Sequence, residues 1–281
     1  MAGAVDLHSH TTASDGTFTP RELVREAARR GVRVLAVTDH DSTEGLADAI
    51  DEAARHPPLR IVPGIEINCD VEGGEIHVLG YCLDYEAPWF QEFCRGQRAE
   101  RRQRVHRMVA RLAELGMPIA AEEVFALVQE GSAGRPHVAQ VLVKRGHVKT
   151  VREAFDRFLA AGKPGHVPRE KLAPVDAVRL IRRAGGVPVF AHPGLADRDA
   201  MIPAMIEAGM MGIECFYSEH TPGQTATYVE TCKRHGLVAT GGSDFHGPRV
   251  RAAQLGIPSI PLAVWDALQQ KAAEARASQP E

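Results

Sequence analysis

Two histidines near the start of the sequence have the spacing of a metal-binding pair. His8 and His10 belong to the segment AVDLHSH, residues 4–10, which begins apolar and then alternates. In a β-strand, residues two apart point to the same face, so the two imidazoles would project together. Paired imidazoles suit a divalent metal, although two such histidines can also be ordinary core residues. Further donors are needed to decide between the two interpretations.

Further donors follow the next apolar segment. The run Val32–Val37 predicts a strand that is buried on both faces, as in a parallel sheet, and Asp39 and His40 come directly after it. Asp15 lies in the loop between the two segments. In barrels built from parallel strands, the chemistry lies at the carboxyl ends of the strands. The position of these donors therefore favours a metal site.

Five later segments also have the length and composition of strands, namely 59–67, 75–81, 186–192, 211–217 and 237–242. Helices separate most of them, and their starts carry capping signals such as Thr19-Pro20 and Thr221-Pro222. Over all seven segments, nine side chains with nitrogen or oxygen donors lie at or near strand ends, and none of them is a thiolate. They are His8, His10, Asp15, His40, Glu66, His77, His192, Asp244 and His246. Such a set suits up to three divalent metals and favours Mn, Fe or Zn without a preference among them by affinity alone. We expect Mn, with Fe or Zn as alternatives.

The order of these segments predicts an α/β fold. Seven βα-like units fit a distorted (β/α)7 TIM-like barrel made of residues 1–85 and 168–281. Between residues 86 and 167 the pattern becomes helical, with apolar residues three and four positions apart, which predicts an inserted helical cap subdomain.

The cap carries cationic residues that could contact an anion. Arg135 and His137 lie in the segment GRPH, and Lys163 lies in GKPGH, where glycines and prolines favour loops. We expect these three residues and His220 to bind substrate. Seven arginines also stand between Arg95 and Arg111, and we interpret them as a solvated helix face.

Composition excludes several classes of protein. The net charge of −3 provides no global attraction to nucleic acid, so any basic surface must be local. Five widely spaced cysteines without a CxxC pair argue against a disulfide framework and against a zinc knot. No leader or apolar run of about 18 residues is found. We therefore expect a cytoplasmic protein without a membrane partner, and no protein partner is implied.

The successive motifs DLHSHTTASDGT, AVTDHDS, GIEI, HVLGY, AHP and GGSDFHG resemble those of the PHP (polymerase and histidinol phosphatase) superfamily over nearly the whole chain. With GRPH in a helical insert, the chain most resembles the stand-alone phosphoesterases that hydrolyse 3',5'-nucleoside bisphosphates. That branch is also linked to 5'-to-3' trimming of short RNA. The resemblance implies a metal-dependent hydrolase that releases the 3'-phosphate of a bisphosphate such as pAp and leaves the 5'-mononucleotide.

The resemblance also implies a trinuclear site. It assigns the first metal to His8, His10, Glu66 and Asp244, the second to Glu66, His77 and His192, and the third to Asp15, His40 and His246. Glu66 would bridge two metals and so take part in catalysis, and His220 would donate the leaving-group proton. We expect Asp6 and Asp39 to orient ligand imidazoles, because metal-bound histidines usually need such a partner.

Three other functions compete with this hypothesis. The first is a phosphatase for histidinol phosphate or another small molecule on the same metals. The second is an amidohydrolase-type C–N hydrolase, which is disfavoured because no strand-end lysine is available for carbamylation. The third is a non-catalytic nucleic-acid binder that uses the arginine-rich cap.

Overall fold

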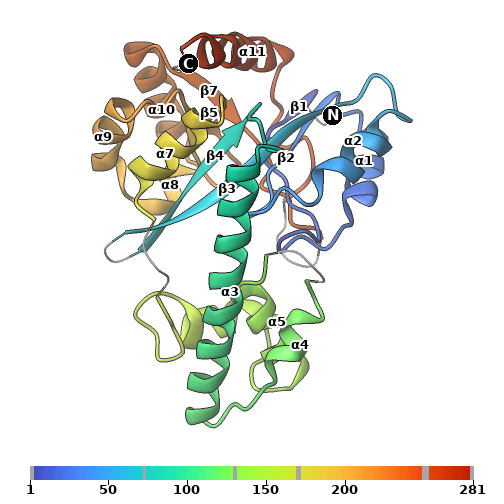
Figure 1. The fold of residues 1–281 in the computed structure, drawn as a ribbon, viewed down its shortest axis with the longest axis vertical. Helices are drawn as coiled ribbons and strands as arrows, with labels where there is room; N and C mark the ends of the chain where they lie inside the picture. The colour runs from blue at the N-terminus through green and yellow to red at the C-terminus, as the bar shows by residue number, and fades with distance from the viewer. Residues whose placement is uncertain (1–2, 72–73, 129–131, 169–171, 249–252, 279–281) are drawn as a thin grey trace.

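A computed structural model describes residues 3–71, 74–128, 132–168, 172–248 and 253–278. Seven strands form one sheet in chain order (Figure 1): β1 (Val5–Asp6), β2 (Val34–Val37), β3 (Arg60–Val71), β4 (Gly74–Tyr81), β5 (Val187–Phe190), β6 (Gly212–Phe216) and β7 (Val238–Gly241). The amide of Leu7 donates to the carbonyl of Gly241 over 3.2 Å, and Ser9 forms a parallel bridge with Phe245. These contacts bring the first and last strands together, and the predicted distorted seven-stranded barrel is confirmed.

One strand runs against the others. β4 pairs antiparallel with both β3 and β5, whereas the other neighbouring strands are parallel. β3 and β4 therefore depart from the pattern of the βα-like units expected from the sequence, because the connection between them is too short for a helical crossover. His77 of β4 lies opposite Asn68 of β3, and Glu66 of β3 bridges to His40. The reversed strand thus brings His77 to the edge where the parallel strands end.

Helices cover the outside of the barrel. They are α1 (Pro20–Arg29), α2 (Leu46–Ala53), α7 (Pro174–Arg183), α8 (Pro193–Ala196), the short 3-10 turn η2 (Asp199–Met201), α9 (Ile202–Glu207), α10 (Pro222–His235) and α11 (Leu262–Ala277). Thr19 and Thr221 cap α1 and α10 through their side chains, as predicted. α2 begins at Leu46, and before it Asp41 adopts a left-handed backbone with φ of 50° while its carboxylate accepts from Arg101.

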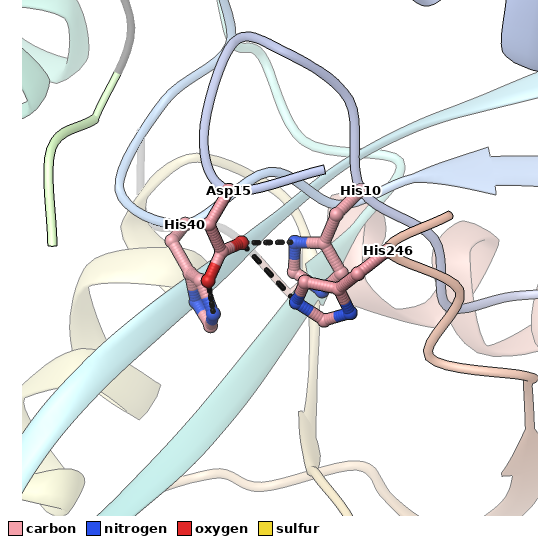
Figure 2. Close-up of side chains that lie close together, drawn as sticks. All are labelled: His10, Asp15, His40 and His246. Atoms are coloured by element: carbon pink, nitrogen blue, oxygen red, sulfur yellow. Dashed lines mark ion pairs between the residues drawn. The ribbon is translucent and has the colours of Figure 1, made fainter. Parts of the chain in front are cut away.

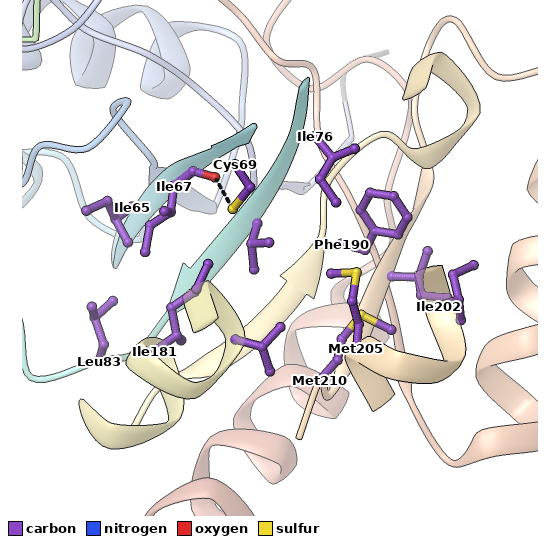
Figure 3. Close-up of a cluster of buried hydrophobic side chains, with 14 of the residues drawn as sticks. Ile65, Ile67, Cys69, Ile76, Leu83, Ile181, Phe190, Ile202, Met205 and Met210 are labelled. Carbon is purple, nitrogen blue, oxygen red and sulfur yellow. Dashed lines mark hydrogen bonds between the residues drawn. The ribbon is translucent and has the colours of Figure 1, made fainter. Parts of the chain in front are cut away.

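A layer of apolar side chains joins the sheet to its helices. Figure 3 shows Ile65 and Ile67 of β3 together with Phe190 of β5, and Ile181 of α7 packs into the same cluster. Burial of this kind is the main favourable term in folding and makes the sheet a rigid base. The strand ends that follow are therefore held in constant positions.

The insertion extends away from the barrel (Figure 1). It contains α3 (Pro88–Glu114), α4 (Ala121–Phe125), α5 (Arg135–Lys144), α6 (Val151–Ala154) and a π-helical turn, η1 (Phe155–Leu159). Met108 and Leu112 of α3 belong to a separate apolar core with α4 and α5, whereas Phe90 and Cys94 of α3 belong to the barrel core. The long helix therefore links both cores, and the division at residues 86 and 167 stays a prediction.

Two further expectations concern the whole chain. All five cysteines are free, and four of them are buried. Among the described residues, no helix combines the length and the apolar character that crossing a membrane requires.

Candidate metal centre

The predicted metal ligands meet at the carboxyl edge of the barrel. Three overlapping groups of donors have ligand atoms within 4.8 Å of one another: His8, His10, Glu66 and Asp244; His10, Asp15, His40 and His246; and His40, Glu66 and His77. His192 lies outside these groups, but its Nε2 is 3.2 Å from Oε1 of Glu66. All nine predicted ligands are therefore in one place.

The first group surrounds the side-chain oxygens of two carboxylates. Nε2 of His8 and Nε2 of His10 lie 3.3 Å and 3.2 Å from Oε2 of Glu66. Nε2 of His10 is also 3.2 Å from Oδ1 of Asp244. The other oxygen of Glu66, Oε1, faces Nδ1 of His77 at 2.8 Å. Because its two oxygens face different histidines, Glu66 has the geometry of a bridging ligand.

Figure 2 shows the group around Asp15, whose carboxylate lies between three imidazoles. Oδ1 of Asp15 is 3.1 Å from Nε2 of His246 and 3.8 Å from Nδ1 of His10, and Oδ2 is 3.8 Å from Nε2 of His40. These residues come from three separate segments of the chain. The cluster therefore exists only when the barrel is closed.

The backbone at two strand ends is unusual. His192 and Asp244 have positive φ values of 28° and 50°, which non-glycine residues adopt rarely. Gly242 packs so closely on His8 that a Cβ at this position would collide with it. Backbone strain such as the positive φ of His192 and Asp244 persists where the surrounding structure holds a functional group in place.

Buried polar atoms in this cluster lack hydrogen-bond partners. Within the described residues they are Nε2 of His8 and His10, Nδ1 of His40 and His192, Oδ1 of Asp15 and Oε2 of Glu66. An unsatisfied buried polar group costs about 1–3 kcal/mol, so six neighbouring ones call for a common partner. Divalent metals accept lone pairs from imidazole and carboxylate, and the donor set therefore fits them.

The charges of the cluster favour the ionised form of Glu66. Burial alone would raise the pKa of Glu66, but the imidazoles of His40, His77 and His8 outweigh it and hold that pKa well below its usual range. Burial lowers the pKa of His40 to about 3 in spite of nearby carboxylates. Burial also opposes a charge on His77, yet Glu66 and Glu75 raise its pKa to about 10. pKa shifts in opposite directions within one cluster of side chains are typical of functional sites.

Glu214 of β6 supports this cluster, and the sequence analysis missed it. Its Oε1 accepts from Nδ1 of His8 at 3.0 Å, and its Oε2 accepts from the backbone amide of His192 at 2.8 Å. The side chain is completely buried. The only signal in the sequence is an acidic residue inside the apolar strand segment GIECF. Glu214 therefore turns Nε2 of His8 toward the other donors.

The two aspartates expected to orient imidazoles form no direct hydrogen bond to an imidazole of the described residues. Asp6 accepts from the backbone amides of His8, Ser243 and Gly256, so its predicted contact with an imidazole is wrong. Asp39 accepts from Ser14 Oγ at 2.6 Å, and that Oγ lies 3.4 Å from Nδ1 of His10. Asp39 therefore reaches an imidazole only through Ser14.

A cavity of about 350 Å³ is lined by predicted metal ligands together with residues of the helical insertion. Three cap arginines line it: Arg101, Arg104 and Arg135. Arg101 donates to Asp41 and Asn68 over 2.7 Å, and Arg135 pairs with Glu75 of β4. The interpretation of the arginine run as a solvated face is wrong for Arg101 and Arg104, which are buried.

Three predicted substrate contacts lie elsewhere. His137 is buried and its Nδ1 accepts from the amide of Gly134, and Lys163 is exposed on its loop. Neither residue lines the cavity. His220 also lies outside the lining, and its Nδ1 donates to the carbonyl of Cys215 while its Nε2 accepts from the amide of Gly194. This arrangement differs from the expected proton donor, because both ring nitrogens already bind backbone groups.

Comparison with known proteins identifies related sequences. Residues 6–166 match the family model described as the PHP domain. The chain is 35% identical to the 5'-3' exoribonuclease Rnm of Escherichia coli (strain K12) over 94% of each chain. It is 33% identical to the 3',5'-nucleoside bisphosphate phosphatase of Chromobacterium violaceum, covering 95% of this chain and 97% of that one.

A third relative and one solved structure complete the comparison. The phosphoribosyl 1,2-cyclic phosphate 1,2-diphosphodiesterase of Eggerthella lenta is 34% identical, with 89% of this chain and 97% of that one covered. A structure from Bifidobacterium adolescentis, which carries the description metal-dependent phosphoesterase, superposes with a TM-score of 0.88 at 32% identity. It covers 96% of this chain and 97% of that chain.

Proposed function

The chain belongs to the PHP domain family and is a metal-dependent phosphoester hydrolase, and on this premise we propose that its substrates are 3',5'-nucleoside bisphosphates such as pAp. The reaction would release the 3'-phosphate and leave the 5'-mononucleotide. A relative with the name 3',5'-nucleoside bisphosphate phosphatase, 33% identical over nearly the whole chain, supports this choice.

The observation that supports the proposal is that predicted metal ligands and guanidinium groups line one cavity. The lining includes Glu66, His192 and Asp244, and it also includes Arg101, Arg104 and Arg135 of the cap. Arg104 donates through Nε to the carbonyl of Val167, and among the described residues its terminal nitrogens make no hydrogen bond. A guanidinium with free terminal nitrogens can bind a phosphate through two parallel hydrogen bonds. A substrate with two phosphates would use both kinds of group.

Each residue then has a defined part. We assign one metal to His8, His10, Glu66 and Asp244, a second to Glu66, His77 and His192, and a third to Asp15, His40 and His246, with Mn expected. Bound divalent ions would supply an activated water and neutralise phosphate charge. Glu214 holds His8 and the backbone of His192, and Tyr217 donates its hydroxyl to Oδ2 of Asp244 over 3.0 Å. Such outer contacts fix the ligands before substrate binds.

The cap residues would hold the phosphate that is not cleaved. Arg135 already pairs with Glu75, so an incoming phosphate must share this guanidinium with a carboxylate. Burial, with Arg135 nearby, lowers the pKa of Arg104 to about 10, and its guanidinium therefore stays charged at neutral pH. Two cations at the cap can thus discriminate a bisphosphate from a monophosphate.

Trimming of short 5'-phosphorylated RNA is the second candidate function. The relative with the name 5'-3' exoribonuclease Rnm, at 35% identity, supports it. The same cap arginines would then bind the 5'-phosphate of an oligonucleotide. Both candidates use one metal cluster and the same leaving 3'-oxygen, and they differ in whether the attacked phosphate carries a further nucleotide.

A phosphate-release panel with Mn²⁺ tests the proposal. It contains 3',5'-bisphosphates, 3'- and 5'-monophosphates, histidinol phosphate and phosphoribosyl 1,2-cyclic phosphate, and nucleotide release is followed for 5'-phosphorylated oligonucleotides. We expect the highest kcat/KM for a 3',5'-bisphosphate, with loss of turnover after chelation. Asp244→Asn should abolish turnover, whereas the exposed Asp266→Asn serves as a matched control.

The competing functions predict other results. If kcat/KM is higher for histidinol phosphate than for any 3',5'-bisphosphate, the protein is a histidinol-phosphate phosphatase instead. Salt-dependent RNA binding without turnover of any phosphate ester would favour a nucleic-acid binder. Hydrolysis of amides alone would favour a C–N hydrolase.

A further inference from the structure

A second cavity lies beside the metal cavity. Its volume is about 510 Å³, within the usual range for small-molecule sites. The residues that line it are Thr17, Phe18, Pro136, Gln140, Val143, Val151 and Pro248. No role in metal or phosphate binding has been assigned to Gln140 or Val143.

The two cavities are neighbours built on the same segments of the chain. Pro136 and Val151 line both of them. One loop contributes Asp15 to the metal cavity and Phe18 to the second cavity. The loop after β7 and the start of α5 contribute to both cavities in the same way. The two cavities therefore adjoin at Pro136 and Val151, so a ligand in the first lies next to the second.

The second cavity differs from the first in chemistry. The first is lined mainly by carboxylates, imidazoles and guanidiniums, whereas the second is lined by an aromatic ring, two valines and two prolines, with Thr17 and Gln140 as its polar members. Phe18 is held in place by edge-on packing against Phe245, with ring centroids 5.5 Å apart. Such walls suit the flat apolar faces of an aromatic group.

One amide stands among these apolar walls. Gln140 of α5 is half-buried and its side chain makes no hydrogen bond to any described residue. A glutamine amide presents a donor and an acceptor side by side, which matches the polar edge of a nucleobase. The cavity thus combines apolar faces with one edge-reading group.

We propose that the second cavity binds the nucleobase of the substrate, with Phe18 and the prolines against the ring and Gln140 at its edge. This inference rests on the proposed function and deepens it, because it names the part of the substrate that the phosphate sites do not hold. The phosphoribosyl cyclic phosphate in the name of one relative has a sugar and phosphate but no nucleobase. The second cavity therefore selects between the substrate classes that the relatives' names describe.

The test compares two substrates that differ only in the base. One is adenosine 3',5'-bisphosphate and the other is its 1-deoxyribose analogue without a base. We expect the ratio of their kcat/KM values to exceed about ten in the wild type, because stacking on aromatic side chains contributes about 1–3 kcal/mol per base. Gln140→Ala and the cavity-filling Val143→Phe should each reduce this ratio at least fivefold. Gln103→Ala, on an exposed position of α3, should leave it unchanged.

A binding experiment separates this inference from the proposed function. Calorimetry on the metal-loaded protein compares adenosine 5'-monophosphate, which has no 3'-phosphate to hydrolyse, with ribose 5-phosphate. Tighter binding of the nucleotide in the wild type, and equal binding in Gln140→Ala and Val143→Phe, would support the nucleobase site even if no bisphosphate is hydrolysed. Equal binding of both ligands to the wild type, or an unchanged kcat/KM ratio in both variants, would overturn it.

Discussion

Replacing Glu214 by glutamine should weaken metal binding although Glu214 is not a ligand. Its two oxygens accept from two donors, Nδ1–H of His8 and the amide of His192. A glutamine has only one acceptor oxygen, so its NH₂ group would face one of the two donors. The change is nearly isosteric, and it removes an interaction without creating a cavity.

The size of the effect follows from these contacts. Hydrogen bonds to charged groups contribute about 1.5–3 kcal/mol, which corresponds to roughly 10- to 150-fold in an equilibrium constant. Loss of a partner that orients a metal ligand costs about 10–100-fold in metal affinity. We therefore expect Glu214→Gln to weaken the tightest Mn²⁺ site 10- to 100-fold and to destabilise the metal-free fold by about 1–3 kcal/mol.

Competition with a chromophoric chelator measures the affinity, and urea denaturation after chelation measures the stability. Glu207→Gln is a matched control, because Glu207 is exposed at the end of α9 and the substitution removes the same charge. A folded Glu214→Gln protein that binds Mn²⁺ within twofold of the wild type would refute the orienting role of this carboxylate.

Four further predictions follow from the site. Glu66→Gln should remove two metals together, since its oxygens face separate histidines, and elemental analysis that finds only one metal lost would contradict a bridge. Asp15→Asn should remove one metal and keep the other two, so equal loss of all three would count against a separate third group. Arg135→Ala should lower the kcat/KM ratio of bisphosphate to monophosphate by roughly one to two decades, and Arg135→Lys should restore it only in part. Burial raises the pKa of the Cys82 thiol to about 11, so its alkylation should accelerate about tenfold per pH unit from pH 8 to 10, and a plateau near pH 9 would contradict this.

Much of the fold can be predicted from local sequence. Alternation predicts that His8 and His10 face the same way, and both Nε2 atoms do face Oε2 of Glu66, although the two residues lie beyond the end of β1 at Asp6. A capping box marks the start of the first helix at Thr19. Segments with the length and composition of strands predict all seven strands, and most of these segments are apolar because a strand buried on both faces needs apolar residues on each. The direction of β4 could not be predicted in this way, because periodicity reports which face is buried and carries no information about which way a strand runs.

Other features depend on contacts between distant segments. Arg101 and Arg104 have the composition of a solvated helix face, but the return of the chain near Val167 and the position of Asp41 bury them beside the metal ligands. The pairing of Glu214 with His8 joins residues 206 positions apart.

The sequence by itself thus determined the chemical types of the donors, their strand-end positions and the helical insertion, since each of these depends on residues close together in the chain. Only the tertiary structure decided which oxygen faces which imidazole, which arginines line the cavity, and that the ring nitrogens of His220 bind the backbone. The physical reason is that hydrogen-bond partners and burial are set by distances between segments, and no local pattern encodes those distances.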